Sequence, residues 1–287
     1  MSRSRGAFSR RAFLKSSAAA FMLAGIPGAL SRCAKTAAKE IPVGVQLYCF
    51  RRELAEDFTG TISAVAEMGY QGVEFADYFD RSAAELRKIL DDNGLKACGT
   101  HIYLDDMLGD NLSNTVEFNQ TLGNKNLIVR WLGEEMVNTP EAFQHTIDLF
   151  NQAVENVKPY GMRVGFHNHD AIFRKYDGEL LWNILADETP PEMILQVDTG
   201  NASNTGVDPI ALLERNQGRS VTIHIKPYSA GNPDAMIGED DLDWQRILRI
   251  CETTGGTEWY IIEYEREGFD PLEALRVNLE NFQQLRV

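Results

Sequence analysis

Two histidines stand two positions apart where a short β-rich run ends, in the segment Arg163-Val164-Gly165-Phe166-His167-Asn168-His169. Residues two apart on a strand point to the same side, so His167 and His169 are predicted to share one face. Three later apolar runs also end in side chains that bind metals: Met193–Asp198 with Asp198, Ser220–Lys226 with His224 and Glu258–Glu265 with Glu263. Because the strand ends of a parallel barrel meet at one mouth, this pattern predicts a site for a divalent cation there.

Polar residues recur at period two within these otherwise apolar runs. In the run that ends at Lys226, His224 lies on the same face as Lys226, and in the earlier run Gln196 shares a face with Asp198. Burying polar groups without partners is costly, and a shared cation would be such a partner. We therefore predict that Asp198, His224 and Glu263 are metal ligands. The alternative is a buried network of hydrogen bonds.

These strand ends belong to a longer alternation of apolar β-type runs and helical stretches that begins at Ile41. The predicted strands are Val43–Tyr48, Gly72–Phe75, Lys96–Tyr103, Asn126–Trp131, Arg163–His167, Met193–Asp198, Ser220–Lys226 and Trp259–Glu265. The predicted helices are Asp57–Met68, Ser82–Asn93, Asn111–Leu122, Pro140–Val157, Glu179–Ala186, Pro209–Glu214, Leu242–Thr254 and Pro271–Leu285. Eight strand–helix pairs close a (β/α)8 TIM barrel, so we predict an α/β fold with one barrel domain over residues 41–287. The irregular stretch Tyr228–Asp241 is predicted to be a loop over the mouth.

The length and charge of the chain narrow the classes of partner. The chain has 287 residues and a formal charge of −14. Residues 1–33 contain six basic and no acidic side chains, so the remainder carries −20. A surface this acidic repels phosphate backbones and anionic lipid heads, which argues against nucleic acid as a partner. Neutral carbohydrates are indifferent to this charge, and the sequence carries no signal for an oligomeric state.

The first 40 residues have the pattern of an export signal and a tether. Ser9-Arg10-Arg11-Ala12-Phe13-Leu14-Lys15 matches the twin-arginine motif, and Ala18–Leu30 is an apolar stretch too short for a stable membrane span. The alternative is a basic disordered tail. Leu30-Ser31-Arg32-Cys33 is similar to a lipoprotein cleavage box, although Arg32 stands where such a box usually has a small residue. We expect export by the twin-arginine route, with the protein periplasmic or lipid-anchored at Cys33.

The barrel segment resembles a known family. The motifs that carry the resemblance are Gly44-Val45-Gln46-Leu47-Tyr48, Gly69-Tyr70-Gln71-Gly72-Val73-Glu74, the His-Asn-His run, Asp198-Thr199-Gly200, His224-Ile225-Lys226 and Gly238-Glu239-Asp240-Asp241-Leu242-Asp243-Trp244. They are similar to those of the xylose isomerase-like TIM barrels, the sugar phosphate isomerases and epimerases related to endonuclease IV and tagatose epimerases. The resemblance covers essentially all of residues 43–287. It implies a metal set of Glu, Asp, His and Glu from the fifth to eighth strand ends, with His167 standing where the first Glu is usual.

Two departures from the family pattern shape the expected chemistry. The trinuclear zinc nucleases need further histidines, and although His101 could match one, Trp131 and Asn201 stand where others belong, so DNA cleavage is not expected. Epimerases with two catalytic glutamates move protons on both faces of the sugar. Because His167 stands in place of one glutamate, the sequence favours a one-base reaction, such as β-elimination from a 3-keto-glycoside or an inosose, more than it otherwise would.

Further residues near the strand ends are assigned to the substrate. His169 and Lys226 are predicted to act in catalysis, Lys226 by holding a developing enolate oxygen, with an ion pair to a loop carboxylate as the alternative. The other predicted substrate contacts are His101, Glu74, Tyr48, Trp131 and Trp244. His101 is expected to donate a hydrogen bond, with a structural histidine as the alternative. Glu74 faces inwards, and the alternative is that it only supports its neighbours. For the aromatic residues, the alternative is that they pack in the hydrophobic core.

The predicted function is a metal-dependent sugar isomerase or epimerase. A divalent ion (Mn²⁺, Mg²⁺, Co²⁺ or Zn²⁺) held by His167, Asp198, His224 and Glu263 would polarise a carbonyl, and Glu263 or His169 would remove the neighbouring proton. Loss of a leaving group instead of reprotonation would make the enzyme a lyase or dehydratase. The remaining alternatives are an exported sugar-binding protein without catalysis and a glycoside hydrolase that uses Glu263 and Asp198.

Overall fold

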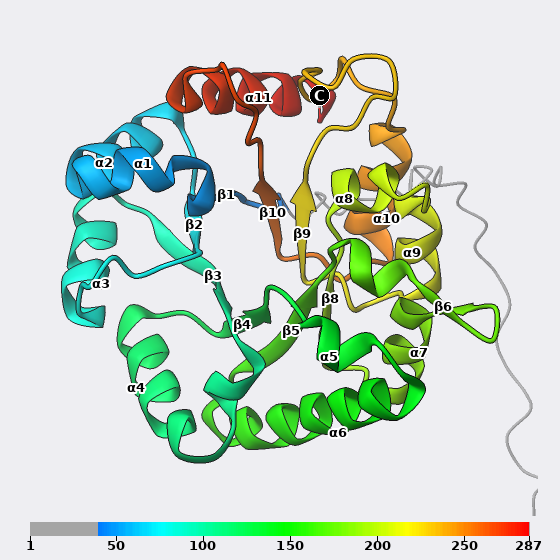
Figure 1. The fold of residues 1–287 in the computed structure, drawn as a ribbon. Coiled ribbons are helices and arrows are strands. Elements are labelled where there is room, and N and C mark those ends of the chain that lie inside the picture. Colours follow the sequence, from blue (N-terminus) through cyan, green and yellow to red (C-terminus); the bar gives the residue numbers. More distant parts are fainter. Residues whose placement is uncertain (1–39, 287) are drawn as a thin grey trace, which may run out of the picture. The chain divides into compact units, whose positions relative to one another are not determined.

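The computed structural model describes residues 40–286, and in this part of the chain eight parallel strands form a nearly closed barrel that helices surround (Figure 1). The predicted TIM barrel is therefore confirmed. The barrel strands are β1 (Val43–Gln46), β2 (Gly72–Phe75), β3 (Lys96–Ile102), β4 (Asn126–Val129), β5 (Arg163–His167), β8 (Ile194–Gln196), β9 (Thr222–Ile225) and β10 (Trp259–Ile262). They pair in chain order from β1 to β8 and again through β1, β10 and β9. A single bridge between Asp198 and His224 joins the two remaining edges.

The helices lie outside this ring of strands (Figure 1). They are α1 (Arg51–Glu56), α2 (Phe58–Met68), α3 (Ala83–Asp92), α4 (Leu112–Leu122), α5 (Glu134–Val137), α6 (Pro140–Val157), α7 (Leu181–Glu188), α8 (Thr199–Asn204), α9 (Pro209–Arg215), α10 (Trp244–Thr253) and α11 (Pro271–Leu285). Short 3-10 helices follow β1 (Leu47–Phe50), precede β5 (Lys158–Tyr160) and follow β5 (Asp170–Phe173). Within residues 40–286, no helix is both long and apolar enough to cross a bilayer.

Local signals in the sequence explain where the helices begin. The Ser82 hydroxyl accepts a hydrogen bond from the Glu85 N–H, and the Glu85 carboxylate accepts one from the Ser82 N–H, which is a capping box at the start of α3. Thr139 caps α6 and Asp270 caps α11, each followed by a proline at the first helical position, where its missing N–H removes no hydrogen bond. The predicted bounds of α6 and α11 are those observed.

Most predicted strands end one to three residues earlier in the structure, and for two predicted elements near the site a local cause explains the difference. The predicted strand Met193–Asp198 ends at Gln196, because the Asp198 side chain caps α8 and the chain turns into that helix. The predicted helix Glu179–Ala186 starts at Leu181, because its first residues pair with β6 (Lys175–Tyr176) as β7 (Glu179–Leu180). Asp177 and Gly178, both at positive φ, form the two-residue turn of this hairpin.

The interior of the barrel changes from charged to apolar to polar along its axis. At the amino-terminal end, the Arg163 guanidinium makes two hydrogen bonds to the Glu258 carboxylate, at 3.0 and 2.7 Å. Ile128, Ile194 and Val221 form a buried apolar layer above this pair. The larger hydrophobic core fills the space between the strands and the helices. The polar layer at the carboxyl-terminal end carries the candidate site.

Candidate metal centre

The four side chains predicted to bind a metal come together at the mouth of the barrel. His167 ends β5, Asp198 follows β8, His224 lies on β9 and Glu263 follows β10. One nitrogen or oxygen of each side chain lies within 4.8 Å of those of the other three. All four side chains are buried. The predicted convergence of these strand ends is confirmed.

The carboxylate of Asp198 has one satisfied and one unsatisfied oxygen. Oδ1 accepts a hydrogen bond of 2.6 Å from the Asn201 N–H. Oδ2 is buried and has no hydrogen-bond partner within residues 40–286. Across the site it faces His224 Nδ1 at 3.7 Å and His167 Nε2 at 3.9 Å. Burial raises the pKa of Asp198 to about 6, against the opposing effect of the Lys226 charge.

The imidazole of His224 lies between two carboxylates. Its Nδ1 is 2.7 Å from Glu263 Oε2, and its Nε2 is 2.6 Å from Glu74 Oε2. Burial lowers the pKa of His224, but Glu74 and Glu263 together raise it to about 10, so both ring nitrogens donate. Nδ1 faces the unsatisfied Asp198 oxygen, whereas Nε2 faces down the barrel. A metal ligand held in place by a carboxylate on its second ring nitrogen has this geometry.

The tautomer of His167 is set by Gln196, for which the sequence predicts only a face shared with Asp198. The amide oxygen of Gln196 lies 3.0 Å from His167 Nδ1, which must therefore carry the proton. The bare Nε2 then points toward Asp198. Gln196 is itself fixed, because its amide donates to Glu74 Oε1 and to the Thr222 hydroxyl, each at 2.8 Å. Burial and the charge of His224 lower the pKa of His167, which keeps the ring in the neutral form that binds metals.

Glu74 does not contact the cavity, contrary to its predicted role in substrate binding. Its carboxylate is fully buried beneath the site. Oε2 lies 2.9 Å from His101 Nε2 and 2.6 Å from His224 Nε2, and the Gln46 amide donates to it at 2.8 Å. Burial opposes ionisation, but His101 and His224 hold the pKa of Glu74 well below its usual range. Glu74 therefore braces the histidines, which is the other role that the sequence left open.

Lys226 is engaged in ion pairs. Its Nζ lies 2.7 Å from Glu263 Oε1 and 3.1 Å from Glu265 Oε1. Burial lowers the pKa of Lys226, but Glu263, Asp198 and Glu265 raise it above the usual value, so the amine stays charged. The alternative prediction for Lys226, a pair with a loop carboxylate, describes this arrangement. Burial raises the pKa of Glu263, yet Lys226 and His224 hold it well below its usual range.

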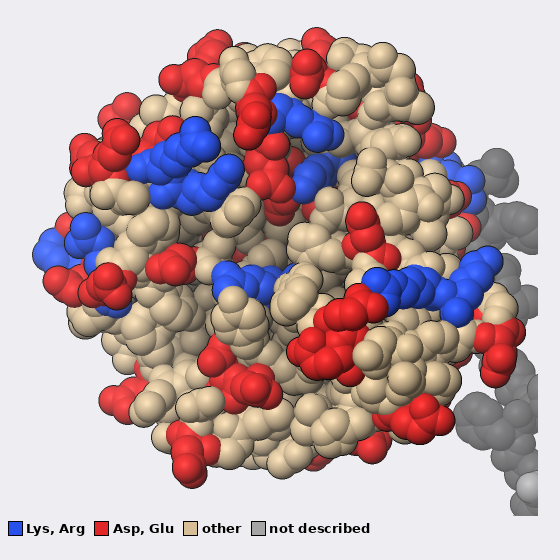
Figure 2. Space-filling model, in the orientation of Figure 1, with Lys and Arg blue, Asp and Glu red and all other residues tan. Residues whose placement is uncertain are grey.

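A cavity of about 470 Å³ opens above these residues. It is lined by Gln46, Tyr48, Ala76, His101, Arg130, Trp131, His167, His169, Glu263 and Glu265. On this face, both acidic and basic side chains lie around the central hollow (Figure 2). The residues predicted to contact substrate that do line the cavity are His101, Tyr48, Trp131 and His169. Burial lowers the pKa of His169, whose ring centroid lies 4.9 Å from that of His167.

Trp244, like Glu74, is a predicted substrate contact that does not line the cavity. Its ring is buried at the start of α10, and its Nε1 donates to Asp240 Oδ2 at 2.9 Å. It packs in the core, and the structure does not bring it into the cavity. Sequence reasoning also missed Arg130 and Glu265, which line the cavity. Both continue the period-two face of their strands past the strand end, and that spacing could have identified them.

The donor set fits a divalent cation. Ligand atoms bound to one cation at about 2.0–2.2 Å lie up to about 4.4 Å apart, so the observed separations need only small side-chain shifts. Two imidazole nitrogens and two carboxylate oxygens suit Zn²⁺, Mn²⁺ or Co²⁺, and they do not select one of them. The buried, unsatisfied Oδ2 of Asp198 is the atom that such an ion would satisfy.

Comparison with known proteins adds a family and several relatives. The sequence model of one family, described as xylose isomerase-like TIM barrel, matches residues 62–285. The rhizopine catabolism protein MocC of Rhizobium meliloti is 23% identical over 264 residues, which cover 78% of this chain and 80% of that protein. Inosose dehydratase of Geobacillus kaustophilus is 24% identical over 219 residues, which cover 68% of this chain and 70% of the enzyme.

Solved structures share the fold. A sugar phosphate isomerase/epimerase from Parabacteroides distasonis superposes with a TM-score of 0.71 at 21% identity, and the match covers 84% of this chain and 96% of that one. At this level of identity, the likeness extends to the fold alone.

Proposed function

The chain belongs to the xylose isomerase-like TIM barrel family, and we propose that it is a metal-dependent enzyme that isomerises or epimerises a keto-sugar. The observation that carries the proposal is the buried Asp198 Oδ2, which has no hydrogen-bond partner within residues 40–286. His224 Nδ1 and His167 Nε2 lie 3.7 and 3.9 Å from it, and one donor atom from each of the four side chains lies within 4.8 Å of the other three. A polar atom buried in this way is costly unless a cation occupies the space between the four side chains.

In this proposal the cation is held by His167, Asp198, His224 and Glu263. When bound, a divalent ion polarises a carbonyl oxygen and makes the neighbouring C–H more acidic. The protein orients the two histidines: Gln196 holds His167 with Nε2 unprotonated, and Glu74 holds the ring of His224 through Nε2. A cation at Nδ1 of His224 would take the place of the proton that this nitrogen carries.

His169 is the proposed proton acceptor. Both carboxylate oxygens of Glu263 are already engaged, Oε1 by Lys226 and Oε2 by His224. His169 lines the cavity and makes no side-chain hydrogen bond within residues 40–286. A base must reach the proton that it removes, and His169 is free to turn toward a sugar in the cavity. Lys226 keeps its charge beside the site and favours negative charge that develops there.

A lyase is the second candidate, and the placement of Glu74 favours it. A two-base epimerase needs proton carriers on both faces of the sugar. Glu74 lies under the site, and His167 replaces the usual glutamate. The site therefore offers a proton acceptor on one face of the sugar and no second carboxylate to return a proton on the other face. In β-elimination the C–H and C–O bonds break, a C=C bond forms, and the departing oxygen leaves as an alcohol or water after taking a proton. Inosose dehydratase, a relative of this chain, is a dehydratase by name.

Glycoside hydrolysis by two carboxylates is less well supported. Such enzymes place their carboxyl groups on either side of the scissile bond, about 5 Å or more apart. Oxygens of Asp198 and Glu263 lie within 4.8 Å of each other, and Asp198 is fully buried. Hydrolysis would also continue in the presence of a chelator, whereas the proposed chemistry would stop.

Proton exchange tests the proposed chemistry. The protein is incubated with Mn²⁺ and a panel of ketohexoses and 3-keto-glycosides in D₂O, and exchange of the proton next to the carbonyl is followed by NMR. We expect exchange that EDTA abolishes and that His169→Gln reduces by about 100-fold or more, with metal content unchanged. Metal is measured in each variant by mass spectrometry. Exchange in no member of the panel would instead favour a protein that only binds sugar.

We further propose that residues 1–40 direct export and that the barrel works outside the cytoplasm. The supporting motif, Arg10-Arg11 within Ser9–Lys15, lies outside the residues that the structure describes, as does Cys33. Replacing both arginines by lysine is expected to retain the protein in the cytoplasmic fraction. Palmitate labelling that depends on Cys33 would distinguish a lipid anchor from a periplasmic form.

A further inference from the structure

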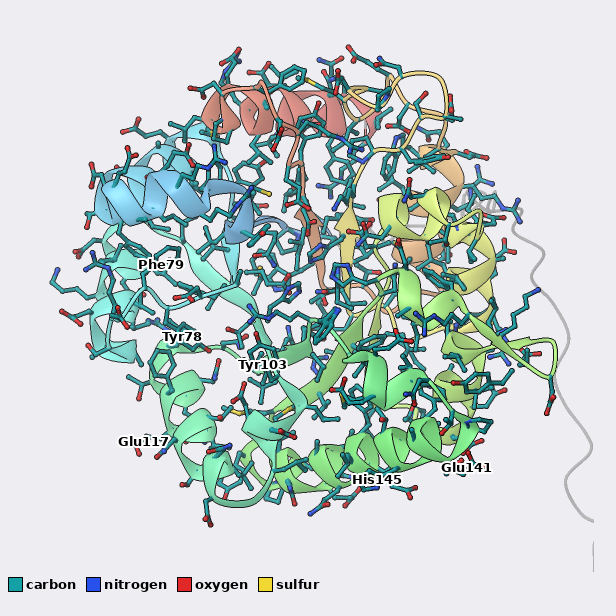
Figure 3. The ribbon with its side chains drawn as sticks, viewed as in Figure 1. Tyr78, Phe79, Tyr103, Glu117, Glu141 and His145 are labelled. Atoms are coloured by element: carbon teal, nitrogen blue, oxygen red, sulfur yellow. The ribbon has the colours of Figure 1, made fainter. Side chains whose placement is uncertain are left out.

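Exposed aromatic side chains are concentrated at one end of the barrel. In the part of the chain that the structure describes, the large hydrophobic residues with exposed side chains are Tyr48, Tyr103, Trp131, Tyr160 and Phe269. The first three, which we call the aromatic rim, are 46%, 51% and 53% exposed and lie one or two residues past the ends of β1, β3 and β4 at the mouth. Figure 3 shows Tyr103 beside the strand ends near the centre of the ring. Only Tyr160 lies at the opposite end, before β5.

The aromatic rim and the candidate ligands occupy opposite halves of the mouth. The ligands come from the ends of β5, β8, β9 and β10, and the rim from β1, β3 and β4. Tyr48 and Trp131 line the same cavity as His169 and Glu263. A molecule that fills this cavity therefore reaches from the buried ligands to the exposed rings. Exposed aromatic surface that is continuous with a cavity indicates a binding role.

Arginine side chains hold two of the rings in place. The guanidinium of Arg51 lies 4.4 Å from the centre of the Tyr48 ring, and that of Arg130 lies 4.4 Å from the centre of the Tyr103 ring. Arg130 also donates to the carbonyl oxygen of Ala76 at 3.0 Å and to the Tyr103 hydroxyl. Such contacts reduce the freedom of the rings before anything binds.

We propose that the aromatic rim binds a second ring of the substrate, which is therefore a glycoside and not a free monosaccharide. This inference rests on the proposed function, because it takes the reacting carbonyl to lie at the buried ligands. A reacting sugar at His169 and Glu263 places its glycosidic substituent toward the exposed half of the mouth. There the substituent, a second sugar or an aryl group, packs its apolar face on Trp131 and Tyr48.

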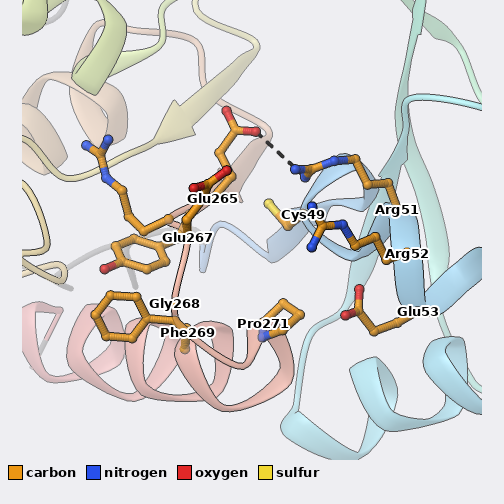
Figure 4. A pocket seen from close by; sticks show the side chains of 12 residues that line it. Cys49, Arg51, Arg52, Glu53, Glu265, Glu267, Gly268, Phe269 and Pro271 are labelled. Atoms are coloured by element: carbon orange, nitrogen blue, oxygen red, sulfur yellow. Dashed lines mark ion pairs between the residues drawn. The ribbon is translucent and has the colours of Figure 1, made fainter.

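A neighbouring cavity indicates that the extended substrate is uncharged. It has a volume of about 440 Å³, lies between α1 and the loop before α11, and shares Glu265 with the mouth cavity. Arg51, Arg52 and Glu53 line one wall, and Glu265 and Glu267 line the other (Figure 4). With cationic and anionic groups facing each other, these walls suit hydroxyl groups better than a phosphate or a carboxylate.

Two probe ligands distinguish a site for one sugar ring from a site that also binds a second ring. These are 3-keto-D-glucose and its phenyl β-glycoside, titrated against Mn²⁺-loaded protein while tryptophan fluorescence and saturation-transfer NMR are recorded. We expect the wild-type protein to bind the phenyl glycoside about tenfold more tightly. Trp131→Ala is expected to bring this ratio close to one, and Trp131→Phe to keep most of it. Tyr160→Ala is the matched control, since it removes an exposed ring at the other end of the barrel and leaves the ratio unchanged.

Three results would overturn the inference. The first is equal affinity of the wild-type protein for the two probes. The second is a Trp131→Ala variant that weakens both probes by the same factor, because the ring would then contact only the reacting sugar. The third is a wild-type dimer in sedimentation velocity that dissociates on the same substitution, because the aromatic rim would then be an interface between copies.

The binding measurements are independent of turnover. If the proposed chemistry fails, no proton exchange is seen with any sugar, but the difference between the two probes can still be measured. If the aromatic rim has no such role, exchange occurs and the affinity ratio is close to one. The two failures are therefore distinguishable.

Discussion

The two carboxylate oxygens of Asp198 have different surroundings, and one substitution separates them. Asp198→Asn keeps an oxygen that can accept from the Asn201 N–H and so preserves the cap of α8. It removes the negative charge that faces His167 and His224. We expect the metal dissociation constant, measured by titration calorimetry with Mn²⁺, to rise by about 100-fold or more, since even residues that only support a ligand contribute about 10–100-fold.

Asp208→Asn is the matched control for this substitution. Asp208 also caps a helix, α9, with its side-chain oxygen accepting from the Ile210 N–H, but it is exposed and does not line the mouth cavity. Its variant should bind Mn²⁺ as the wild type does. Unchanged Mn²⁺ affinity in Asp198→Asn would show that Asp198 is not a ligand.

The position of Glu74 beneath the histidines leads to a second prediction. Glu74→Gln retains the size of the side chain but removes the charge that holds His224 and His101. We expect Mn²⁺ affinity to fall by about 10–100-fold, while KM at saturating Mn²⁺ changes by less than about threefold. A large rise in KM at saturating metal would instead support the role in substrate binding that the sequence suggested.

At the residue level, the sequence predicted the four candidate ligands, which the structure brings together, better than the residues that support them. His167, Asp198, His224 and Glu263 are predictable because each ends an apolar run, and the strand ends of a parallel barrel converge. Gln196 was seen to share a face with Asp198, but an amide has no charge that would mark it as part of a site. Glu74 and Trp244 were assigned to the substrate because period and residue type do not reveal the depth of a side chain.

At the level of elements, an ion pair ties strands together at the end of the barrel opposite the site. Arg163 begins β5 and donates two hydrogen bonds to Glu258, which directly precedes β10. Glu258 also forms an ion pair of 3.2 Å with Lys125. The hydrogen bonds from Arg163, opposed by partial burial, lower the pKa of Glu258 from 4.5 to about 2. These strands are far apart in the chain, so the pair is a long-range contact.

The lowered pKa predicts how stability depends on pH. Because the folded-state pKa of Glu258 is below its unfolded value, the pair stabilises the fold above about pH 4.5, and this contribution is lost as the pH falls toward 2. Glu258 is about one-third exposed, so we expect a contribution of about 1 kcal/mol after solvent screening. Urea unfolding at pH 6 and pH 3 should show a smaller loss of stability for Glu258→Gln than for the wild type.

Glu214→Gln is the control for this measurement. Glu214 also pairs with an arginine, Arg246, but both side chains are about half exposed and lie on the helical surface. Its variant should lose stability between pH 6 and pH 3 as the wild type does. Identical pH dependence in Glu258→Gln and the wild type would contradict the prediction.

The bounds of a helix could be predicted where a capping residue marks its start. They could not be predicted where a short hairpin precedes the helix. Thr139-Pro140 and Asp270-Pro271 are strong start signals, and the helices that follow them were predicted with the observed bounds. The hairpin around Asp177-Gly178 was missed because its strands have two residues each, too few to show a period. The dipeptide itself is a hairpin signal and would have identified the turn.

At the level of the whole molecule, the eightfold alternation was enough to predict the barrel, because few other folds use eight strand–helix pairs. The sequence does not reveal how the barrel closes. β8 and β9 form the weakest junction, which we call the seam. Its backbone contacts are the bridge between Asp198 and His224, the bond from the His224 N–H to the Val197 carbonyl at 2.9 Å, and that from the Leu195 N–H to the Arg219 carbonyl at 2.8 Å.

Two of the four candidate ligands, Asp198 and His224, thus lie on either side of the seam, and a bound cation would cross-link it. A ligand that binds only the folded state at 100 times its dissociation constant adds about 2.7 kcal/mol. For a chain of this length, that is a rise in Tm of about 5–10 °C. We expect Mn²⁺ at this excess to raise the Tm of EDTA-treated protein by this amount, and Asp198→Asn to show little response at the same concentration. Calorimetric scans on both proteins and on Asp208→Asn measure the effect, and an equal rise in all three would mean that the stabilising ion binds away from the seam.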